Sequence, residues 1–573
     1  LRPDLPELYQ AVCTSLPKID AASIITNAIL EDVVKERVLA SAAVCKQHNI
    51  NFGVMVSLDG VGEVHDEVRG RKGNFDSAIH TINYFRQQNI PTSFGCTITR
   101  SNALYVDELL DYAISEGLYG RFRIAEFIDR LYNSTQTEFI RNFDEKTAYH
   151  LGLFFFRAEH DFETHSAHQK TYRSIRAMLT EGKPRQTGCP YHTQSVILTS
   201  RGDLLYCSPK SPILGNVLTN SPGKIYFSNL SKRREMIKKD CDDCIHDYHV
   251  PVSFREKVGF FLKNHRIRQR YNCDRLLRQA KQLTKQKVSV TDVSRLSSKQ
   301  VLIVGWYGTE TAGDKAILWT IIQRLRSRAD SPERIYLASL YPFISQWTVK
   351  EMELGNISVI ETYSPRFEQV CRVVNEVVVG GGPLMDIEAL NHILYAAIQA
   401  AKINAIVRVE GCGIGPLATP VYTKVVTETL KLADHITLRD SNSTQRCIQD
   451  FAVTSVETVA DPATDYVEFV KAKSAILTNT TPPLGHARNI ACFLREWGQD
   501  YAGKLSKAEY SGMKHQFETQ LVEFIIELAR ANNADIHLLP MHTFQIGGDD
   551  RVFNRQLAKK SPLLTFLNRL ESW

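Results

Sequence analysis

The stretch 301–314, VLIVGWYGTETAGD, decides the fold of the larger part of this 573-residue chain. An apolar run of strand composition leads into a loop that carries Gly305, Gly308 and Gly313, and a segment of helical period follows. A glycine-rich turn between a strand and a helix places backbone N–H groups and the positive helix end where an anion can reach them. The stretch therefore predicts an α/β fold and a ligand-binding loop, with Asp314 at its end.

Two more apolar runs end in glycines in the same way. They are VVVGGGPLMD (377–386), with Gly380, Gly381 and Gly382, and VEGCGIGPL (409–417), with Gly411, Gly413 and Gly415. Glycine lets the backbone approach a ligand closely. Because the carboxyl ends of parallel strands meet at one edge of a sheet, the three loops predict one site for a phosphorylated or sugar-like ligand.

Further apolar runs around these loops extend the same pattern from residue 301 to the end of the chain. RIYLASLY, ISVIETY, HITLRD and SVETVAD read as strands that lead into loops, and a second half begins near Asn489 with IACFLREW and ADIHLLPMH. No G-x4-G-K-[ST] sequence occurs, and no clean G-x-G-x-x-G sequence has an acidic residue after it. Nucleotide-dependent phosphoryl transfer and Rossmann redox chemistry are therefore disfavoured.

The first 150 residues alternate short β-branched runs with segments of helical period. Examples are AASIITNAIL, INFGVMVSLDG, PTSFGCTITR and RFRIAEFIDR, with helical segments between them. This rhythm is typical of βα units with parallel strands. Chemistry in such sheets gathers at the carboxyl ends of the strands, where SLDG, TRSN and EFIDR lie.

Between residues 187 and 249 the sequence changes to short strands, turns and four cysteines. Cys189 is followed by twelve residues, a glycine, four residues and Cys207, and the CDDC sequence supplies Cys241 and Cys244. A hairpin through SRGDLLYC would return the second thiol beside the first. Thiolates brought together by turns bind an iron–sulfur cluster or structural zinc, and four unrelated buried thiols are the remaining alternative.

Composition and charge narrow the class of protein. No apolar stretch is long enough to span a membrane and no secretion signal opens the chain, so we expect a cytoplasmic protein with reduced thiols. Residues 255–299 hold 13 Lys or Arg against 3 Asp or Glu, a local charge of +10, whereas the whole chain carries +6. A basic helical linker explains this run better than a nucleic-acid-binding face. The chain starts at Leu, and both ends fall inside structural patterns, which suggests a piece of a longer protein.

These patterns predict four consecutive segments. They are a partial βα barrel (1–180), a cysteine-rich extension (181–254), a basic helical linker (255–298) and a Rossmann-like domain (299–573).

SLDGVGEVHDEVRGRKGNF (57–75), followed by the four cysteines, resembles the radical SAM enzymes that carry a C-terminal SPASM or twitch extension. The resemblance covers roughly residues 20–250. It implies that Cys189, Cys207, Cys241 and Cys244 hold one auxiliary [4Fe-4S] cluster.

The same resemblance implies that Ser57, Asp59 and Arg69 bind S-adenosylmethionine or a substrate at the barrel mouth. In this family a C-x3-C-x2-C loop holds the cluster that binds S-adenosylmethionine, and the sequence has no such loop. Either the first βα unit precedes Leu1, or the module has lost its radical chemistry. Asp59 is also a good turn former, and His65 with Asp66 is also suited to cap a helix.

GWYGTETAGD, VVVGGGPLMD, GCGIGPL, TLRDSNS, ADPATD and PMHTFQIGGDDR, in this order, resemble the polysaccharide pyruvyl transferase family. The resemblance covers roughly residues 300–560. It implies two Rossmann-like halves around a cleft, as in GT-B glycosyltransferases. The implied reaction transfers the enolpyruvyl unit of phosphoenolpyruvate to sugar hydroxyls of a cell-surface glycan.

Such a reaction needs cations for the donor's phosphate and carboxylate, a proton donor for the vinyl carbon and a base for the sugar. Arg439 is the first candidate for the anion clamp and Arg495 the second. Asp386 is the candidate for orienting or deprotonating the acceptor, and His542 for the proton donor. Substrate would lie against Gly305, Gly308, Gly313, Asp314, Gly381, Gly382, Gly413 and Gly415.

Structural roles compete with each of these assignments. Asp440 and Asp461 are also suited to cap helices, Arg439 to pair with a nearby carboxylate, and His542 to be a satisfied core residue. The family's closing Gly-x-Arg-Leu-His stretch has no counterpart before Trp573. A sugar-nucleotide-dependent GT-B glycosyltransferase and a non-catalytic scaffold that binds glycan or protein remain the alternatives.

Overall fold

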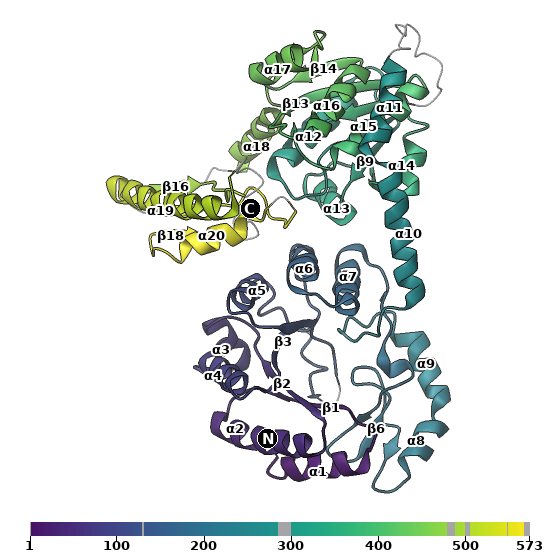
Figure 1. Cartoon of the computed structure of the whole chain (residues 1–573), viewed down its shortest axis with the longest axis vertical. Coiled ribbons are helices and arrows are strands. Elements are labelled where there is room, and N and C mark those ends of the chain that lie inside the picture. Colours follow the sequence, from purple (N-terminus) through teal and green to yellow (C-terminus); the bar gives the residue numbers. More distant parts are fainter. Residues whose placement is uncertain are drawn as a thin grey trace. The chain divides into compact units, whose positions relative to one another are not determined.

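The computed structural model describes residues 2–128, 131–284, 299–477, 488–498, 505–546 and 548–566. The chain divides into two compact units, Leu1–Ser253 (unit 1) and Phe254–Trp573 (unit 2), whose elements are labelled in Figure 1. Both units combine helices with parallel sheets, which confirms the predicted α/β fold class. Among the described residues, no helix combines the length and the apolar character that crossing a membrane requires.

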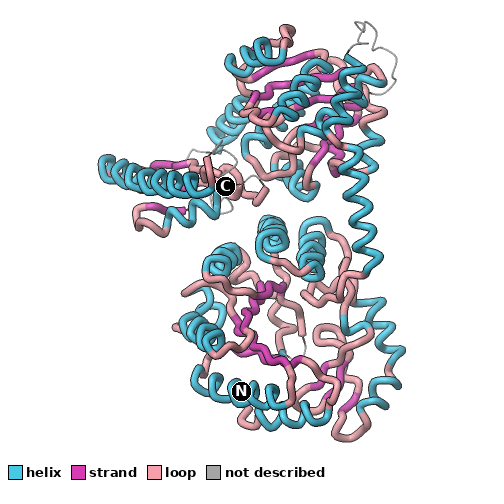
Figure 2. Tube along the Cα trace, viewed as in Figure 1, coloured by secondary structure: helices cyan, strands magenta, loops and turns pink. Residues whose placement is uncertain are grey.

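A four-stranded parallel sheet of order β1-β2-β3-β4 forms the centre of unit 1. Strand order that follows chain order is typical of a βα barrel, and the sheet curves accordingly in Figure 2. In β2 the residues Phe52, Val54 and Val56 are buried in alternation with more exposed ones. The elements are α1 (Leu5–Ser15), β1 (Ala21–Thr26), α2 (Glu31–Gln47), β2 (Asn51–Ser57), α3 (Glu63–Arg69), α4 (Asn74–Gln87), β3 (Thr92–Ile98), α5 (Val106–Ser115), β4 (Gly120–Ile124), α6 (Glu145–Arg157), a π-helical turn (Ala158–Phe162) and α7 (Ser166–Glu181).

The cysteine-rich part of unit 1 is a small antiparallel sheet with two helices. Its elements are a 3-10 turn (Pro190–His192), β5 (Ile197–Leu198), β6 (Asp203–Leu205), β7 (Gly215–Asn216), α8 (Pro222–Ser228) and α9 (Leu230–Asp240). β5 and β6 form the hairpin that the sequence predicts before Cys207, with Gly202 at φ +86° in its turn.

The main sheet of unit 2 has the strand order β10-β9-β8-β11-β13-β14-β15, all parallel, and β12 pairs with β13. This order reverses between β8 and β11, as in doubly wound Rossmann folds, where ligands bind at the reversal point. The elements are α10 (Phe254–Arg270), α11 (Cys273–Thr284), β8 (Gln300–Val304), α12 (Ala312–Ser327), β9 (Arg334–Ser339), α13 (Pro342–Glu351), β10 (Ile357–Glu361), α14 (Pro365–Val370), β11 (Glu376–Val379), β12 (Pro383–Leu384), α15 (Leu390–Lys402), β13 (Ile406–Ile414), α16 (Pro420–Leu432), β14 (His435–Leu438), α17 (Ser441–Phe451), β15 (Glu457–Thr458) and α18 (Ala463–Leu477).

A second parallel sheet, of order β16-β17-β18, closes unit 2. Its elements are β16 (Arg488–Cys492), α19 (Lys507–Asn532), β17 (Ala534–Leu538), α20 (Asp550–Ala558) and β18 (Leu564–Phe566). A capping box of Ser506 and Glu509 starts α19, and the buried Val522 and Ile525 anchor this helix in the core of the sheet.

The predicted basic linker, 255–298, differs along its length. α10 has no buried residue, as expected of a solvated helix. α11, in contrast, buries Leu276, Leu277 and Ala280 in the core of the main sheet and packs against α15 and α16. This part of the linker prediction is wrong, because the helix combines its basic face with an apolar stripe that belongs to the Rossmann-like core. Residues 285–298 lie outside the described residues.

We therefore predict that Leu276→Ala loosens unit 2, because removing a buried leucine side chain costs about 2–5 kcal/mol. Hydrogen–deuterium exchange of the full chain should show faster exchange in the peptides of α11, α15 and α16. Arg278→Ala, which changes an exposed residue of the same helix, is the control and should exchange like the parent. Parent-like exchange in Leu276→Ala would mean that α11 is not part of this core.

Candidate functional site

The loops that follow β8 and β11 touch at the point where the strand order reverses. A Cβ atom at Gly305 would lie 1.9 Å from the carbonyl oxygen of Gly380, so Gly305 must be glycine for the two loops to pack this closely, whereas a Cβ atom at Gly380 would meet Cδ1 of Ile321 at 2.2 Å. Gly308 has φ +86°, in the left-handed region that favours glycine. These glycines therefore serve first to bring two strand ends together.

Asp314 lies at the centre of this junction. It belongs to the first turn of α12, is 7% exposed, and accepts the N–H of Gly382 at 2.5 Å through Oδ1. Burial raises the pKa of Asp314 to about 6, although hydrogen bonds from Gly382 and Thr311 and the charges of Arg439 and Arg495 oppose the rise. The carboxyl group therefore exchanges its proton near neutral pH.

Arg439 follows β14 and brings a positive charge to the same place. Its side chain packs on Gly413, where a Cβ atom would lie 2.9 Å from Nε, and Nη1 forms an ion pair with Asp461 at 3.0 Å. Asp461 also accepts the N–H of Ala463, so it caps α18 as well as holding the arginine. Asp440 caps α17 through the N–H of Ser443. Both acidic residues thus have the capping contacts considered from the sequence.

Arg495 reaches the junction from the second sheet. It follows β16, and its charge acts on both Asp314 and His542. Its Nε lies 4.0 Å from Oδ1 of the buried Asp550. The two arginines named from the sequence therefore come from different sheets and lie close enough to Asp314 to act on the same carboxyl group.

His542 joins the two sheets and is 1% exposed. Its Nε2–H donates to the carbonyl oxygen of Ile546 at 2.8 Å, so Nδ1 accepts the hydroxyl of Thr311 at 2.8 Å. A backbone bridge between Thr311 and His542 reinforces this contact. Burial lowers the pKa of His542, as does the charge of Arg495. This geometry gives the histidine a structural part and argues against its predicted role as a proton donor.

Asp386 has a structural contact through one of its two carboxylate oxygens. Its Oδ2 accepts the backbone N–H groups of Ala418 and Thr419, at 2.7 and 2.9 Å, at the start of α16. The residue therefore ties the loop after β12 to the loop after β13. Its Oδ1 is buried and has no hydrogen-bond partner among the described residues, so the predicted role of this carboxylate toward the acceptor stays a prediction.

The remaining motif glycines differ in their surroundings. Gly381 has φ +81° and lies against the Tyr307 ring, and a Cβ atom at Gly415 would lie 2.8 Å from Cβ of Met385. No heavy atom lies within 4 Å of a Cβ atom placed at Gly313, so this position is open.

Sequence reasoning missed several residues that shape the site. Lys315 is buried and pairs with Glu310 at 2.5 Å and Glu351 at 2.7 Å, and Glu310 itself has φ +57°. Thr311 and Tyr307 also contact predicted site residues. Tyr307, Glu310 and Thr311 belong to the quoted motif and Lys315 follows it directly, so the motif's non-glycine positions were the available signal.

In unit 1, Asp59 and Arg69 bind each other. Oδ2 of the buried Asp59 lies 2.5 Å from Nη2 of Arg69, and its Oδ1 accepts the N–H of Thr97. The side chain of Asn102 donates to the Asp59 carbonyl, and the Asp59 N–H donates to His65 Nδ1. This network ties β2 to β3, and the buried Nε of Arg69 has no hydrogen-bond partner among the described residues, so the predicted cofactor-binding role of both residues stays a prediction.

The other residues of that motif have clear positions. Asp66 accepts the N–H groups of Gly73 and Phe75, so it caps α4, as the structural alternative expected. Ser57 is the last residue of β2 and is half-buried.

The four predicted metal ligands come together. Cys189, Cys207, Cys241 and Cys244 line one small cavity of unit 1, together with His192 and Arg185. Burial raises the pKa of all four thiols, and that of Cys241 rises to about 12 because the other three thiols add to the effect. Within the described residues, no three His, Cys, Asp or Glu side chains are grouped closely enough to hold a single metal ion.

Two curated proteins are similar to parts of the chain. The sporulation killing factor maturation protein SkfB of Bacillus subtilis (strain 168) is 36% identical over 72 residues, which are 13% of this chain and 18% of SkfB. Fe-coproporphyrin III synthase of Methanosarcina barkeri (strain Fusaro / DSM 804) is 32% identical over 111 residues, which are 19% of this chain and 25% of that protein. The chain thus spans a quarter or less of these radical SAM homologues.

Two solved structures show limited likeness. The anSMEcpe structure with bound AdoMet and a Cp18Cys peptide is 17% identical, with a TM-score of 0.29 over 43% of this chain and 78% of that one. The UDP-GlcNAc 2-epimerase of Neisseria meningitidis with UDP-GlcNAc is 12% identical, with a TM-score of 0.31 over 48% of this chain and 73% of that one.

The family model for polysaccharide pyruvyl transferase matches residues 234–573, which is more than half of the chain. Together with the radical SAM homologues, this match supports a fusion of the two enzyme types. The chain belongs to the polysaccharide pyruvyl transferase family.

Proposed function

We propose that unit 2 transfers the enolpyruvyl group of phosphoenolpyruvate to a sugar of a polysaccharide. The observation that carries the proposal is the buried carboxyl group of Asp314 beside Arg439 and Arg495, at the point where the strand order reverses. Two arginines suit a donor that carries both a phosphate and a carboxylate, because a guanidinium binds either group with two parallel hydrogen bonds.

In the reaction, the vinyl carbon of the donor takes a proton, and a sugar hydroxyl forms a bond to the neighbouring carbon. A second hydroxyl then displaces phosphate and completes the pyruvate ketal. Asp314 is the better-placed proton donor, because a carboxyl group with a pKa of about 6 holds a proton close to neutral pH. Both ring nitrogens of His542 are occupied, so this residue is left to position Thr311 and the loop that contains Ile546.

Phosphate release distinguishes this reaction from its alternatives. The protein should release phosphate from phosphoenolpyruvate only when a polysaccharide acceptor is present, and the acceptor should gain a pyruvate ketal, which NMR of the glycan detects. Release of a nucleoside diphosphate from a sugar nucleotide would instead support a glycosyltransferase. Neither release would support a binding scaffold.

In unit 1, the four cysteines fit the auxiliary cluster that the sequence resemblance implies. Thiolates around one zinc ion lie only about 3.8 Å apart, given Zn–S bonds of about 2.3 Å, whereas the ligands of a cluster surround a larger body. Four thiols that line a cavity without meeting at one point match the cluster better. Cys189, Cys207, Cys241 and Cys244 would hold it, and a bound cluster would keep them as thiolates.

Arg439→Ala should lower phosphoenolpyruvate-dependent transfer by about 30-fold to several thousand-fold, since losing a charge-assisted contact to a bound anion costs about 2–5 kcal/mol. The fold should persist, because the pair with the partly exposed Asp461 contributes about 1 kcal/mol or less. Arg334→Ala is the control, because Arg334 is the first residue of β9 and the site lies at the carboxyl ends of the strands. Transfer at the parent rate in folded Arg439→Ala protein would reject the anion clamp and make Arg495 the residue to test.

Asp314→Asn should lower kcat by about 10²-fold to 10⁴-fold, the range typical of a lost general acid. In the parent, kcat/KM should fall as pH rises through about 6, because the carboxyl group loses its proton. The variant should lack this limb of the pH profile. Asp330→Asn, an exposed change, is the control.

Asp314→Asn should lower activity, but it should not lower the stability of the fold. The pKa of Asp314 is higher in the folded state than the ordinary 3.8, so the parent loses stability as pH rises from about 4 to 6, by about 3 kcal/mol. Asp314→Asn should remove this loss and be at least as stable as the parent at pH 7. A variant that unfolds at pH 7 would show that the ionised carboxylate is needed for folding.

After anaerobic reconstitution, the parent should contain iron and sulfide in equal amounts, and Cys241→Ser and Cys244→Ser should lose most of both. Cys273→Ser, which changes a cysteine of α11 in unit 2, is the control and should keep the cluster. One zinc ion without sulfide would identify a structural zinc site. Absence of both metals would mean that the thiols only pack.

A further inference from the structure

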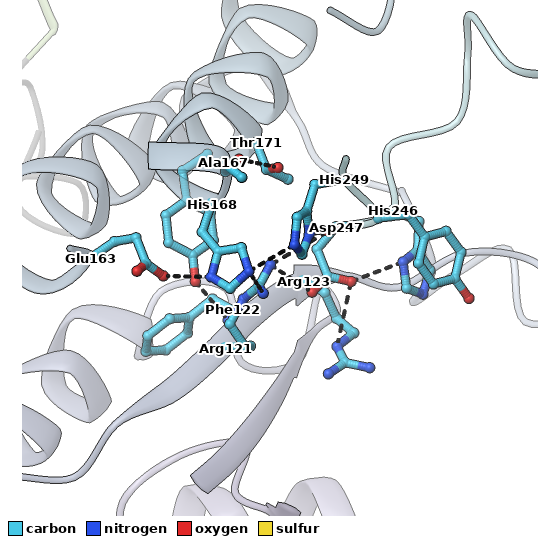
Figure 3. A network of polar contacts seen from close by, with 12 residues as sticks. Arg121, Phe122, Arg123, Glu163, Ala167, His168, Thr171, His246, Asp247 and His249 are labelled. Carbon is cyan, nitrogen blue, oxygen red and sulfur yellow. Dashed lines mark hydrogen bonds and ion pairs between the residues drawn. The ribbon is translucent and has the colours of Figure 1, made fainter. Parts of the chain in front are cut away.

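Unit 1 contains a cavity of about 550 Å³ that no predicted site residue lines. Its wall includes Arg121 and Arg123 of β4 and the segment His246–His249, which follows the cysteine pair. A cavity of this size is within the range of pockets that bind small molecules. Figure 3 shows the polar network along its wall.

Two arginines and two carboxylates line the cavity. Asp247 is buried between the two arginines, with Oδ2 3.2 Å from Nη2 of Arg121 and Oδ1 3.9 Å from Nε of Arg123. Glu126 also lines the cavity, but it pairs with Arg141 at 3.6 Å and Lys210 at 3.7 Å. One carboxylate therefore faces two guanidinium groups.

Arg123 is the less satisfied of the two arginines. Among the described residues its Nε is buried without a hydrogen-bond partner, and its Nη2 contacts the weak acceptor Sδ of Met55 at 3.5 Å. A partly buried guanidinium with unused donors is suited to a carboxylate ligand, which accepts two parallel hydrogen bonds.

Beside the arginines, three side chains form a continuous chain of hydrogen bonds. Oε2 of the buried Glu163 lies 3.2 Å from Nδ1 of His168, and Nε2 of His168 lies 2.9 Å from Nε2 of His249 (Figure 3). Arg121 donates to the same Nε2 of His168 at 2.6 Å. The three residues come from the loop before α7, from α7 itself and from the segment that lines the cavity.

The donors fix the direction of this chain. Because the Arg121 N–H can only donate, Nε2 of His168 accepts, and His168 carries its proton on Nδ1, toward Glu163. Nε2 of His249 must then donate to His168, which leaves Nδ1 of His249 with a lone pair. The Asp247 carbonyl lies 3.4 Å from this atom, near the limit of a hydrogen bond.

The surroundings keep His249 neutral and Glu163 ionised. Burial lowers the pKa of His249, and His168 and Arg121 lower it further, so the ring is neutral near pH 7. The pKa of Glu163 is lowered despite its burial, because His168, the His165 N–H and Tyr119 donate to it. The other ionisable groups that line the cavity are Arg123, Glu126, Tyr191, His246, Asp247 and Tyr248.

We propose that this cavity is a second catalytic site, in which His249 takes a proton from a substrate whose carboxylate is held by Arg123. The X–H bond of the substrate breaks, its electron pair stays on X, and the proton forms a bond to Nδ1 of His249. The imidazolium that forms keeps its Nε2 proton, which donates to His168, and the contact of His168 with the ionised Glu163 holds this orientation. His249 is the catalytic base, and His168 and Glu163 are positioning residues. The proposal does not depend on the function proposed for unit 2.

The tautomers of the two histidines test the direction of the hydrogen-bond chain from Glu163 to His249. In the full chain labelled with ¹⁵N-histidine, long-range ¹H–¹⁵N spectra at neutral pH should show His168 protonated on Nδ1 and His249 protonated on Nε2, both neutral. Glu163→Leu, which removes the acceptor of the Nδ1 proton, should weaken the preference of His168 and alter the titration of His249. His165→Gln, an exposed neighbour in sequence, is the control. A cationic His168, or one protonated on Nε2, would overturn the direction proposed for this hydrogen-bond chain.

Acetate, the smallest stable carboxylate probe, tests the anion site in the same spectra. Titration with acetate should shift the His249 signals to saturation, and Arg123→Gln should weaken this binding at least tenfold. Arg123→Lys should restore part of it, and Arg173→Gln, which breaks an ion pair of α7 with Glu159, should bind like the parent. Unchanged His249 signals, or parent-like binding by folded Arg123→Gln protein, would reject the site.

Discussion

The hydrogen bond between the Gly382 N–H and the Asp314 carboxyl group is the contact on which the arrangement of unit 2 depends. It joins the first turn of α12 to the loop after β11, at the reversal of strand order. The loops must be free of side chains to approach so closely, which the 1.9 Å distance at Gly305 makes explicit. The same closeness buries the carboxyl group and raises its pKa. The close approach of the two loops therefore determines both their packing and the pKa of the Asp314 carboxyl group.

Patterns that are local in sequence predicted the fold well. Apolar runs that end in glycine marked β8, β11 and β13, and the rhythm of strands and helices gave the parallel sheets of both units. The burial of α11 was missed, although a helix was predicted there, because its basic residues obscured a short apolar stripe of Leu276, Leu277 and Ala280. Charge counted along a segment averages over the faces of a helix, and burial depends on one face alone.

Contacts that are distant in sequence could not be predicted in the same way. His542 finds its partner Thr311 231 positions away, and Asp386 meets amides of the next loop, 32 and 33 positions on. Residue type gave each of them a catalytic role, whereas the structure shows which lone pairs are already used. In unit 1 the residues Arg121, His168 and His249 form no sequence motif, since they come from a strand, a helix and a loop.

Burial also changes which residue type suits a proton transfer. It raises the pKa of Asp314 toward neutral pH and lowers that of His542 away from it, because it disfavours the charged form of each. An aspartate is therefore the donor that we propose in unit 2. In unit 1, burial likewise lowers the pKa of His249, which keeps the ring neutral, and His168 and the ionised Glu163 hold its orientation. The depth and the neighbours of a side chain, and not its ordinary pKa alone, therefore have to decide which residue is assigned as acid or base.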